Sequence, residues 1–176
     1  MNRVRALSFA LFISAAACGR SARPGTAPTG PVALPDVAVE PLAGSGGAAP
    51  APVSIRAVSR GRVTVIDVWA SWCTACREVT KQVEQLAQQK KGTDLFVVGL
   101  DVGEDRATVA SFLEDKKPDY PIYLDASFSL PDAIGQRELP AVIVVDREGT
   151  IRMVRKRLDP EVTKLVDDLL AAPPAR

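Results

Sequence analysis

The hydrophobic residues of this chain fall into continuous runs and into sets with helical spacing. Apolar runs at residues 63–68, 95–100 and 141–145 are typical of strands that are buried on both faces. Between the first two runs, apolar side chains recur every three or four residues, which predicts an amphipathic helix that ends near Gly92. Strand, helix and strand in this order form a parallel unit, so we expect an α/β domain with a covered sheet.

Shorter signals complete the expected domain. Gly149 lies in a turn between the run at 141–145 and an alternating segment at 150–154, which predicts an antiparallel hairpin. Asp159 and Pro160 predict the start of a last helix. The other expected elements are an edge strand at 53–58, a helix through Val109, Phe112 and Leu113, a strand at 121–125 and a helix at 129–134.

The N-terminus has the pattern of an export signal. Arg3 and Arg5 precede an apolar run that is too short to span a bilayer and that ends in small residues, so residues 1–17 are predicted to be a signal peptide. Cys18 follows directly, in a context that resembles the lipidation motif of bacterial lipoproteins. The alternative is an ordinary cleavage that leaves Cys18 as a free thiol.

The next segment lacks any sustained periodicity. Residues 18–52 are rich in Ala, Pro, Gly, Ser and Thr, a composition that buries too little apolar surface to offset the entropy of ordering. We therefore expect a tether at 18–52, a single folded domain at 53–172 and a tail at 173–176.

The charge of the chain excludes one class of partner. Its 22 Lys and Arg residues and 21 Asp and Glu residues are interleaved, and the net charge is +1. Proteins that bind nucleic acid carry a basic patch or stripe. We therefore expect no nucleic-acid partner.

The spacing of two cysteines supplies the candidate chemistry. Cys73 follows the first buried strand, and Cys76 comes three residues later, where the helix begins. Unpaired backbone N–H groups and the positive end of the helix dipole favour the thiolate of a cysteine in this place. One helical turn brings the two sulfurs within bonding reach. We therefore expect a reversible dithiol–disulfide pair.

Two other uses of a C-x-x-C pair are disfavoured. A four-ligand zinc site needs further His or Cys ligands, but the chain has no His, and its remaining cysteine, Cys18, lies far upstream. A purely structural disulfide across so short a loop removes little chain entropy. We expect the cysteine side chains to carry the redox chemistry without a metal or other cofactor.

The segment around the cysteines resembles a known active site. Asp67 lies on the strand six residues before Cys73, as an acid does in the active-site segment of thioredoxins. The chain is most similar to the membrane-anchored TlpA/ResA-like thiol–disulfide oxidoreductases. This resemblance covers residues 53–172 and implies a thioredoxin-like α/β fold, with a central mixed sheet covered by helices. The α/β segment between the second strand and the hairpin resembles the central insertion of this group.

The resemblance implies roles for four residues. Cys73 is expected to be exposed and to attack a partner's disulfide, and Cys76, more buried, is expected to resolve the mixed disulfide. Asp67 is expected to lie beneath Cys76 with a raised pKa and to accept its proton, although its hydrogen bonds have the alternative role of fixing the strand. Glu104 matches a family acid that lies near the dithiol and tunes its protonation. Its alternative role is that of an acid at the N-terminus of the following helix.

Five further residues are expected to contact substrate. Pro140 resembles the cis-proline that faces the cysteines in this fold, where the backbone of Leu139 is free to bind an incoming strand. The alternative is a trans-proline at the start of a strand. Trp72 is expected to cover the disulfide, and Thr74 and Ala75, between the cysteines, are expected to contact the same partner.

Two positions depart from the TlpA/ResA-like pattern. Asp67 stands where these proteins commonly have Asn, and Ala75 stands where most have Pro. A C-x-A-C pair is instead similar to the C-terminal domain of the reductant conductor DsbD. Because Thr74 and Ala75 provide no cation that favours a strongly oxidising couple, we expect a reductant.

These features together predict an enzyme. We expect a monomeric thiol–disulfide oxidoreductase that is lipid-anchored on the periplasmic side of a bacterial cell envelope. Its expected partners are protein disulfides or dithiols, including by resemblance the haem-site cysteines of apocytochrome c, and a membrane reductant donor. The alternatives are a soluble periplasmic location, a disulfide oxidase or isomerase, and a non-catalytic redox sensor or binding module.

Overall fold

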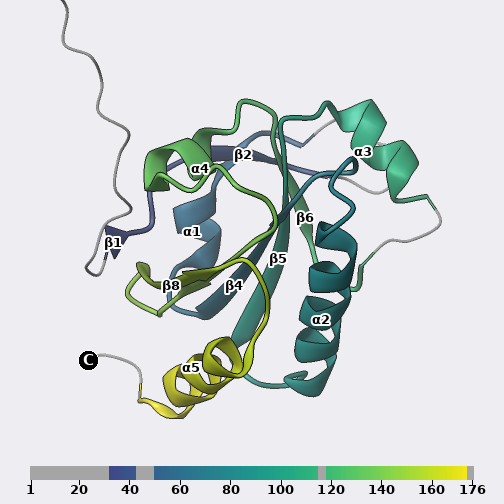
Figure 1. The fold of residues 1–176 in the computed structure, drawn as a ribbon. Coiled ribbons are helices and arrows are strands. Elements are labelled where there is room, and N and C mark those ends of the chain that lie inside the picture. Colours follow the sequence, from purple (N-terminus) through teal and green to yellow (C-terminus); the bar gives the residue numbers. More distant parts are fainter. Residues whose placement is uncertain (1–31, 43–49, 115–117, 174–176) are drawn as a thin grey trace, which may run out of the picture.

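A mixed sheet runs through the described part of the chain (Figure 1). The computed structural model describes residues 32–42, 50–114 and 118–173. Within them, the sheet has eight strands in the order β1-β8-β7-β4-β5-β6-β2-β3. The predicted signal peptide at residues 1–17 and the candidate lipidation site Cys18 lie outside the described residues.

The centre of the sheet follows the predicted apolar runs. β4 (Val63–Trp69) lies between β5 (Leu95–Val102), which is parallel to it, and β7 (Ala141–Val145), which is antiparallel. Every residue of β4 is buried, as expected for a strand that is covered on both faces. β8 (Thr150–Arg155) completes the hairpin with β7, and β6 (Ile122–Asp125) continues the parallel side. The predicted parallel unit and the predicted hairpin are therefore confirmed.

Helices cover both faces of the sheet (Figure 1). α2 (Cys76–Gln89), α3 (Arg106–Phe112) and α5 (Pro160–Ala171) contribute apolar side chains to the cluster on one face. α1 (Ile55–Ser59) and α4 (Ser129–Ile134) contribute to the cluster on the other face. The predicted α3, β6 and α4 thus form an α/β segment between β5 and β7. Among the described residues, no helix is both long and apolar enough to cross a bilayer.

The alternation of side chains along β4 decides which residues face α2. Val65 and Trp69 belong to the apolar cluster beneath α2, whereas Ile66 and Val68 belong to the cluster on the opposite face. Successive residues of a strand point to opposite faces, so Asp67 faces α2 as well. The fold therefore directs the carboxyl group of Asp67 toward the helix that follows the cysteine loop.

The tether predicted at residues 18–52 is wrong over residues 32–42. β1 (Val32–Ala33) pairs with β8. β2 (Ala38–Pro41) pairs with β6 and also with β3 (Val53–Ser54). The folded domain therefore begins before the predicted boundary, and its N-terminal segment contributes strands to the sheet.

Two buried side chains hold this N-terminal segment on the domain. Leu34 is 0 % exposed and Val39 is 1 % exposed, and both belong to the apolar cluster that includes α1 and α4. The composition of residues 18–52, rich in Ala, Pro and Gly, gave no sign that these two side chains are buried. Their burial depends on strands that are distant in the sequence, which local pattern does not report.

The edge strand predicted at residues 53–58 is also largely wrong. Only Val53–Ser54 form a strand, and the chain then turns into α1. The Oγ of Ser54 accepts a hydrogen bond of 3.1 Å from the N–H of Ala57, which satisfies one of the free donors at the start of the helix. The alternating pattern favoured a strand, but the capping serine selected a helix.

The packing of residues 32–42 leads to a test of stability. We expect Leu34→Ala to lower the free energy of unfolding of the full chain by about 2–5 kcal/mol, because it empties a fully buried leucine site. Ala38 on β2 is exposed, so Ala38→Ser is the matched control and should change stability by less than about 0.5 kcal/mol. Urea unfolding measures both. Equal stability of the two variants would mean that this segment is not part of the folded domain.

Candidate active site

The cysteine loop connects β4 to the N-terminus of α2. Cys73 and Cys76 form a disulfide, with their Cα atoms 5.3 Å apart. The backbone N–H of Cys76 donates to the carbonyl of Cys73 at 3.1 Å and lies 3.2 Å from the Sγ of the same residue. No side chain caps α2 at Ala75. The sulfur of Cys73 therefore occupies the place at the helix N-terminus where a capping acceptor would otherwise lie, and this place favours a thiolate.

The predicted exposure of Cys73 is wrong in degree. Cys73 is 7 % exposed and Cys76 is 2 % exposed, so both are buried and Cys76 only slightly more so. The three residues around them, Trp72, Thr74 and Ala75, are exposed. Trp72 is 64 % exposed, a large apolar side chain open to solvent beside the disulfide. These three side chains therefore form the surface around the buried disulfide.

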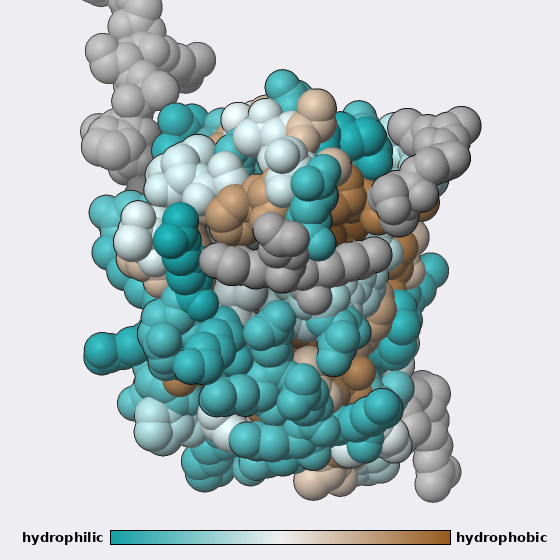
Figure 2. All heavy atoms as spheres, turned by 90° about the vertical axis from the view of Figure 1, so that its right-hand side faces the viewer, coloured by the Kyte–Doolittle hydropathy of each residue, from teal (hydrophilic) through white to brown (hydrophobic). Residues whose placement is uncertain are grey.

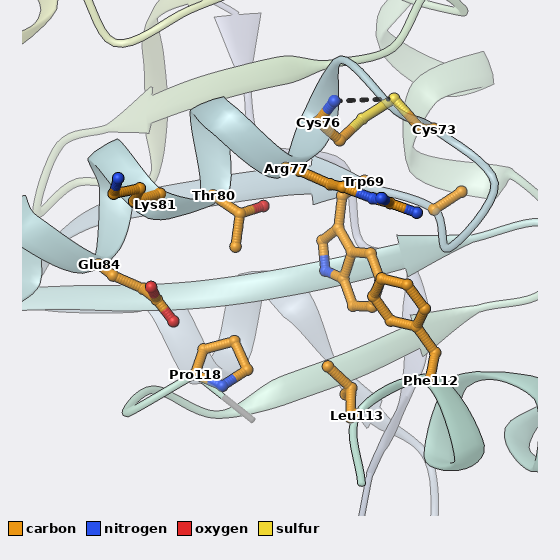
Figure 3. Close-up of a pocket in the computed structure, with 11 residues that line it drawn as sticks. Trp69, Cys73, Cys76, Arg77, Thr80, Lys81, Glu84, Phe112, Leu113 and Pro118 are labelled. Atoms are coloured by element: carbon orange, nitrogen blue, oxygen red, sulfur yellow. Dashed lines mark hydrogen bonds between the residues drawn. A yellow bond between two sulfur atoms is a disulfide. The ribbon is translucent and has the colours of Figure 1, made fainter. Parts of the chain in front are cut away.

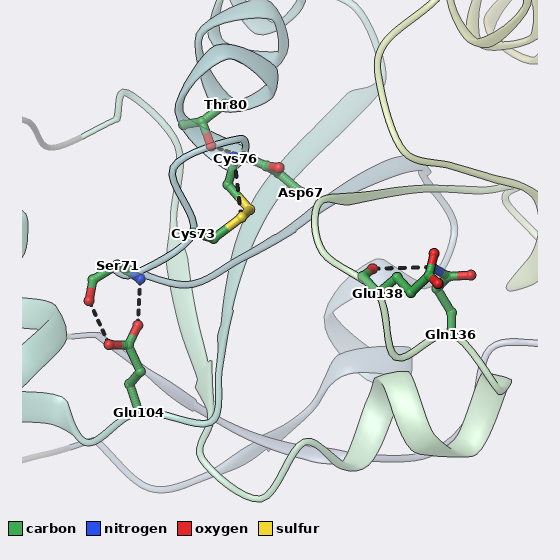
Figure 4. Close-up of a disulfide and its surroundings, with 8 residues drawn as sticks. All are labelled: Asp67, Ser71, Cys73, Cys76, Thr80, Glu104, Gln136 and Glu138. Atoms are coloured by element: carbon green, nitrogen blue, oxygen red, sulfur yellow. Dashed lines mark hydrogen bonds between the residues drawn. A yellow bond between two sulfur atoms is a disulfide. The ribbon is translucent and has the colours of Figure 1, made fainter.

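Asp67 lies fully enclosed on β4, the strand that leads into the cysteine loop (Figure 4). Its Oδ2 accepts hydrogen bonds from the hydroxyl of Thr80 at 2.7 Å and from the hydroxyl of Tyr120 at 3.1 Å. Its Oδ1 has no hydrogen-bond partner in the described part of the chain. Burial raises the pKa of Asp67 to about 6, and the two hydroxyl donors oppose this rise.

The position of Thr80 relates Asp67 to the second cysteine. Thr80 lies four residues after Cys76 on α2, so both side chains project from the same face of the helix. The hydrogen bonds of Asp67 thus run to α2 and to Tyr120, which precedes β6. The predicted burial and raised pKa of Asp67 are confirmed. Sequence reasoning missed Thr80 and Tyr120, because neither a hydroxyl on an amphipathic helix nor one in the segment before β6 signalled a contact with Asp67.

Glu104 contacts the cysteine loop through Ser71. Its carboxylate accepts hydrogen bonds from the backbone N–H of Ser71 at 2.5 Å and from the hydroxyl of Ser71 at 2.6 Å (Figure 4). The alternative role, at the N-terminus of α3, is taken by Asp105, which accepts from the N–H of Thr108 at 2.8 Å. Glu104 therefore acts on the loop that leads to Cys73.

Asp101 is a second buried acid that sequence reasoning missed. It lies on β5 beside Trp69 in the strand register, is 0 % exposed, and has no hydrogen-bond partner for either carboxyl oxygen in the described chain. Burial and the neighbouring carboxylate of Glu104 raise the pKa of Asp101 to about 8. Asp101 is thus mainly protonated at neutral pH. An acid within an apolar strand was one of the signals that identified Asp67. The same signal was present at Asp101 but was not used.

Pro140 lies where β7 begins, next to the cysteine loop. The peptide bond between Leu139 and Pro140 is cis, which confirms the predicted isomer. Ala141, the first residue of β7, pairs with Val68 near the end of β4. The fold therefore brings Leu139 and Pro140 to the end of the sheet from which the cysteine loop leaves.

A cavity of about 410 Å³ lies beside the disulfide (Figure 3). Its apolar wall includes Trp69 and Phe112, whose ring centroids are 5.6 Å apart. Trp69 is 4 % exposed and belongs to the core. Cys76, Thr80 and Glu84 line the cavity from α2. Figure 2 views the side of the molecule on which α2 and α3 lie, where hydrophobic residues gather in the upper half and hydrophilic residues cover the lower half.

The described residues offer no obvious metal centre. No group of three or more His, Cys, Asp or Glu side chains within them is placed to hold a metal ion. The cysteine pair can form and break a disulfide, and the buried carboxyl groups can take up and release protons.

The raised pKa of Asp101 leads to a prediction on pH and stability. Its pKa of about 8 in the folded protein lies above the ordinary value of 3.8, so the protonated acid stabilises the fold, fully below about pH 4 and progressively less as the pH rises through 8. The free energy of unfolding falls by about 1.4 kcal/mol for each unit of difference between the two pKa values. We expect Asp101→Asn to abolish this fall, because asparagine does not titrate. Urea unfolding at pH 5 and pH 8 measures it. Glu148 is exposed, and Glu148→Gln is the control. An Asp101→Asn profile parallel to that of the wild type would contradict the prediction.

Comparison with known proteins identifies the family of this chain. A family model described as Redoxin matches residues 32–169. Thiol-disulfide oxidoreductase ResA of Geobacillus thermodenitrificans is 27% identical over 97 residues, which cover 54% of this chain and 55% of that protein. Thiol:disulfide interchange protein DsbE of Escherichia coli is 29% identical over 96 residues, which cover 54% of this chain and 50% of that protein. The chain thus spans about half the length of the curated relatives it matches.

Solved structures show the same fold. The thioredoxin domain of a thiol-disulfide oxidoreductase from Bacteroides vulgatus superposes with a TM-score of 0.65 at 18% identity, covering 78% of this chain and 95% of that one. A secreted thiol-disulfide isomerase from Corynebacterium glutamicum superposes with a TM-score of 0.61 at 22% identity, covering 78% and 83%. The chain therefore has a thioredoxin-like fold of the TlpA/ResA-like kind and belongs to the Redoxin family.

Proposed function

We propose that this protein is an extracytoplasmic thiol–disulfide oxidoreductase that reduces protein disulfides through Cys73 and Cys76. The observation that carries the proposal is the sulfur of Cys73 at the N-terminus of α2, 3.2 Å from a backbone nitrogen, with the enclosed acid Asp67 hydrogen-bonded to Thr80 one turn beyond the second cysteine. A pair of this kind supplies a stabilised thiolate and a base in one site. The names of the ResA and DsbE relatives, which describe disulfide chemistry, support the same reaction.

The reaction proceeds in two exchanges of sulfur. The thiolate of Cys73 attacks one sulfur of a substrate disulfide, forms a mixed disulfide and releases the other substrate sulfur as a thiolate. Asp67 then takes the proton of the Cys76 thiol, and the resulting thiolate attacks the sulfur of Cys73. The mixed disulfide breaks, and the second substrate thiolate leaves. The substrate disulfide has then been reduced by two electrons, and Cys73 and Cys76 have been oxidised to a disulfide.

The exposed residues around the pair provide a place for the substrate chain. Trp72, Thr74 and Ala75 surround the disulfide at the surface, and Leu139 with Pro140 lies at the same end of the sheet. An extended substrate segment binds there by backbone hydrogen bonds to Leu139 and by contact with the indole of Trp72. By resemblance to TlpA/ResA-like proteins, the substrates proposed include the haem-site cysteines of apocytochrome c.

The location and the electron supply belong to the same proposal. The signal sequence before Cys18 supports export and a lipid anchor at that cysteine, and a related structure from Corynebacterium glutamicum is described as secreted. The protein then works as a monomer on the periplasmic side of a membrane, where a membrane reductant donor reduces the disulfide again after each turnover.

Disulfide reduction by variants of the full chain tests the proposed activity. We expect the wild type to catalyse reduction of insulin by dithiothreitol, and Cys73→Ser to abolish it, because the attacking sulfur is lost. Cys76→Ser should accumulate a mixed disulfide that is visible on non-reducing gels. The matched control is Cys18→Ser, which should retain full turnover in detergent-free solution. A wild type without turnover would indicate a redox sensor or binding module instead.

The direction of electron flow has its own test. Because Thr74 and Ala75 bring no cation to the thiolate, we expect a reduction potential close to that of thioredoxin, about −270 mV. Equilibration of the full chain with dithiothreitol buffers measures it. A potential approaching −120 mV, typical of a strong disulfide oxidase, would support disulfide formation or isomerisation as the function.

A further inference from the structure

Both hydrogen bonds that reach the side chain of Asp67 end on the same oxygen atom. Thr80 on α2 donates its hydroxyl to Oδ2 at 2.7 Å, and Tyr120 donates to the same atom at 3.1 Å. The other oxygen, Oδ1, is buried without a hydrogen-bond partner among the described residues. A carboxylate offers about two acceptor sites on each oxygen. The two hydroxyls therefore fill the sites of Oδ2, whereas those of Oδ1 stay open.

The open oxygen has a natural partner when the disulfide is reduced. Native proteins leave few buried polar atoms unpaired, because such atoms lower stability. In the disulfide the sulfur of Cys76 carries no proton, but after reduction its thiol can donate one. Thr80, the residue that binds Oδ2, lies one turn after Cys76 on the same face of α2, near Asp67 (Figure 4). The unpaired state of Oδ1 thus fits an atom whose partner is the reduced second cysteine.

Gly99 gives the ring of Tyr120 its place beside the acid. It lies on β5 directly opposite Asp67 in the strand register. A Cβ at this position would lie 3.2 Å from the ring of Tyr120 and 2.5 Å from the side chain of Ile122. Glycine otherwise weakens the interior of a strand, and it often marks a close approach of another group. The missing side chain therefore lets the hydroxyl of Tyr120 reach Oδ2.

Tyr120 remains a donor at every pH at which the protein works. Burial and the charge of Asp67 raise the pKa of Tyr120 above its ordinary value of 10, so its hydroxyl keeps the proton. Its side chain is 6 % exposed and belongs to the apolar cluster beneath α2. The two donors to Oδ2 thus come from a helix and from a packed aromatic ring, and both are fixed by the fold.

We propose that Thr80 and Tyr120 are positioning residues that hold the Oδ2 of Asp67, so that Oδ1 is the atom that exchanges a proton with the second cysteine. This inference rests on the proposed reductase function. During closure the S–H bond of Cys76 breaks, an O–H bond forms on Oδ1, and the sulfur keeps the electron pair with which it attacks Cys73. When the donor reduces the disulfide, Cys76 leaves as a thiolate and takes the proton back. Neither hydrogen bond to Oδ2 has to break in either direction.

The groups that face Asp67 also set its pKa. Burial and the charge of Glu84 on α2 raise the pKa and the two hydroxyls lower it, with a result of about 6. The strand partners on either side, Gly99 on β5 and Val142 on β7, do not titrate, and neither does Cys76 in the disulfide. Removal of either hydroxyl therefore raises the pKa of Asp67 and leaves less carboxylate at neutral pH. A test of positioning has to separate this effect from the orientation of the carboxyl group.

The experiment measures closure and the pKa of Asp67 independently. Reduced full chain is mixed with two short synthetic peptides joined by one disulfide, and acid quench with mass spectrometry follows the mixed disulfide and its closure between pH 5 and pH 8. NMR titration of the Asp67 carboxyl carbon in the disulfide form gives the change in pKa, so the fraction of carboxylate can be divided out. We expect Thr80→Val and Tyr120→Phe each to slow closure per carboxylate about tenfold, because the carboxyl group is no longer held. Formation of the mixed disulfide should not change.

Matched variants make the result specific. Thr80→Ser restores the hydroxyl and should recover the rate lost in Thr80→Val. Tyr123 packs on the opposite face of the sheet, so Tyr123→Phe should leave closure unchanged. Gly99→Ala places a methyl group against the ring of Tyr120 and should slow closure although both hydroxyls are kept. Circular dichroism checks folding, and if Thr80→Val or Gly99→Ala does not fold, Tyr120→Phe and Tyr123→Phe still decide the matter.

The opposite assignment of the two oxygens predicts the opposite result. If Oδ2 took the proton, removal of a hydroxyl would free a site on it, and closure per carboxylate in Tyr120→Phe would equal or exceed that of the wild type. Either outcome overturns the inference, as does equal slowing by Tyr123→Phe. Closure at the wild-type rate in Asp67→Asn would remove Asp67 from the reaction and the inference with it. Failure of the wild type to reduce insulin would instead reject the underlying reductase function.

Discussion

The enclosure of one carboxyl group between the central sheet and α2 is the interaction on which this site depends. Asp67 lies on β4 among residues that are all buried, and the loss of hydration disfavours its charged form. Two hydroxyl donors on one oxygen offset part of that cost, and the other oxygen is left without a partner. An acid in this balance accepts a proton near neutral pH, whereas an ordinary aspartate does not. The proposed thiol chemistry at the helix N-terminus uses such a group as its base.

Two acids on neighbouring strands share this face of the sheet. Asp67 on β4 and Asp101 on β5 each follow the alternation that also turns Val97 toward α2. Trp69 stands beside Asp101 in the register and packs against Phe112. Asp67 is hydrogen-bonded to Thr80 on α2, whereas Asp101 has no hydrogen-bond partner among the described residues.

Local pattern predicted the elements whose signals lie within the element itself. The central strands, α2 with its cysteines, the hairpin and the last helix were predicted because their periodicity and caps are contiguous in the chain. Asp67 and the cis-proline at 140 were predicted through resemblance, and their burial and isomer are confirmed. Thr80 and Tyr120 were missed because their importance arises only when two distant segments meet at one oxygen atom. β1 and β2 were missed for the same physical reason, since each depends on strands formed much later in the chain.

The position of β1 has a consequence for the order in which the protein is completed. Val32 pairs with Ile151, so the first described strand must wait for one of the last to be synthesised. Contacts between residues so far apart close slowly, because the long loop between them loses its entropy first. Until β1 pairs with it, β8 offers the open backbone groups of a sheet edge to other chains. A newly made molecule is therefore most prone to association at the edge of β8 until β1 covers it.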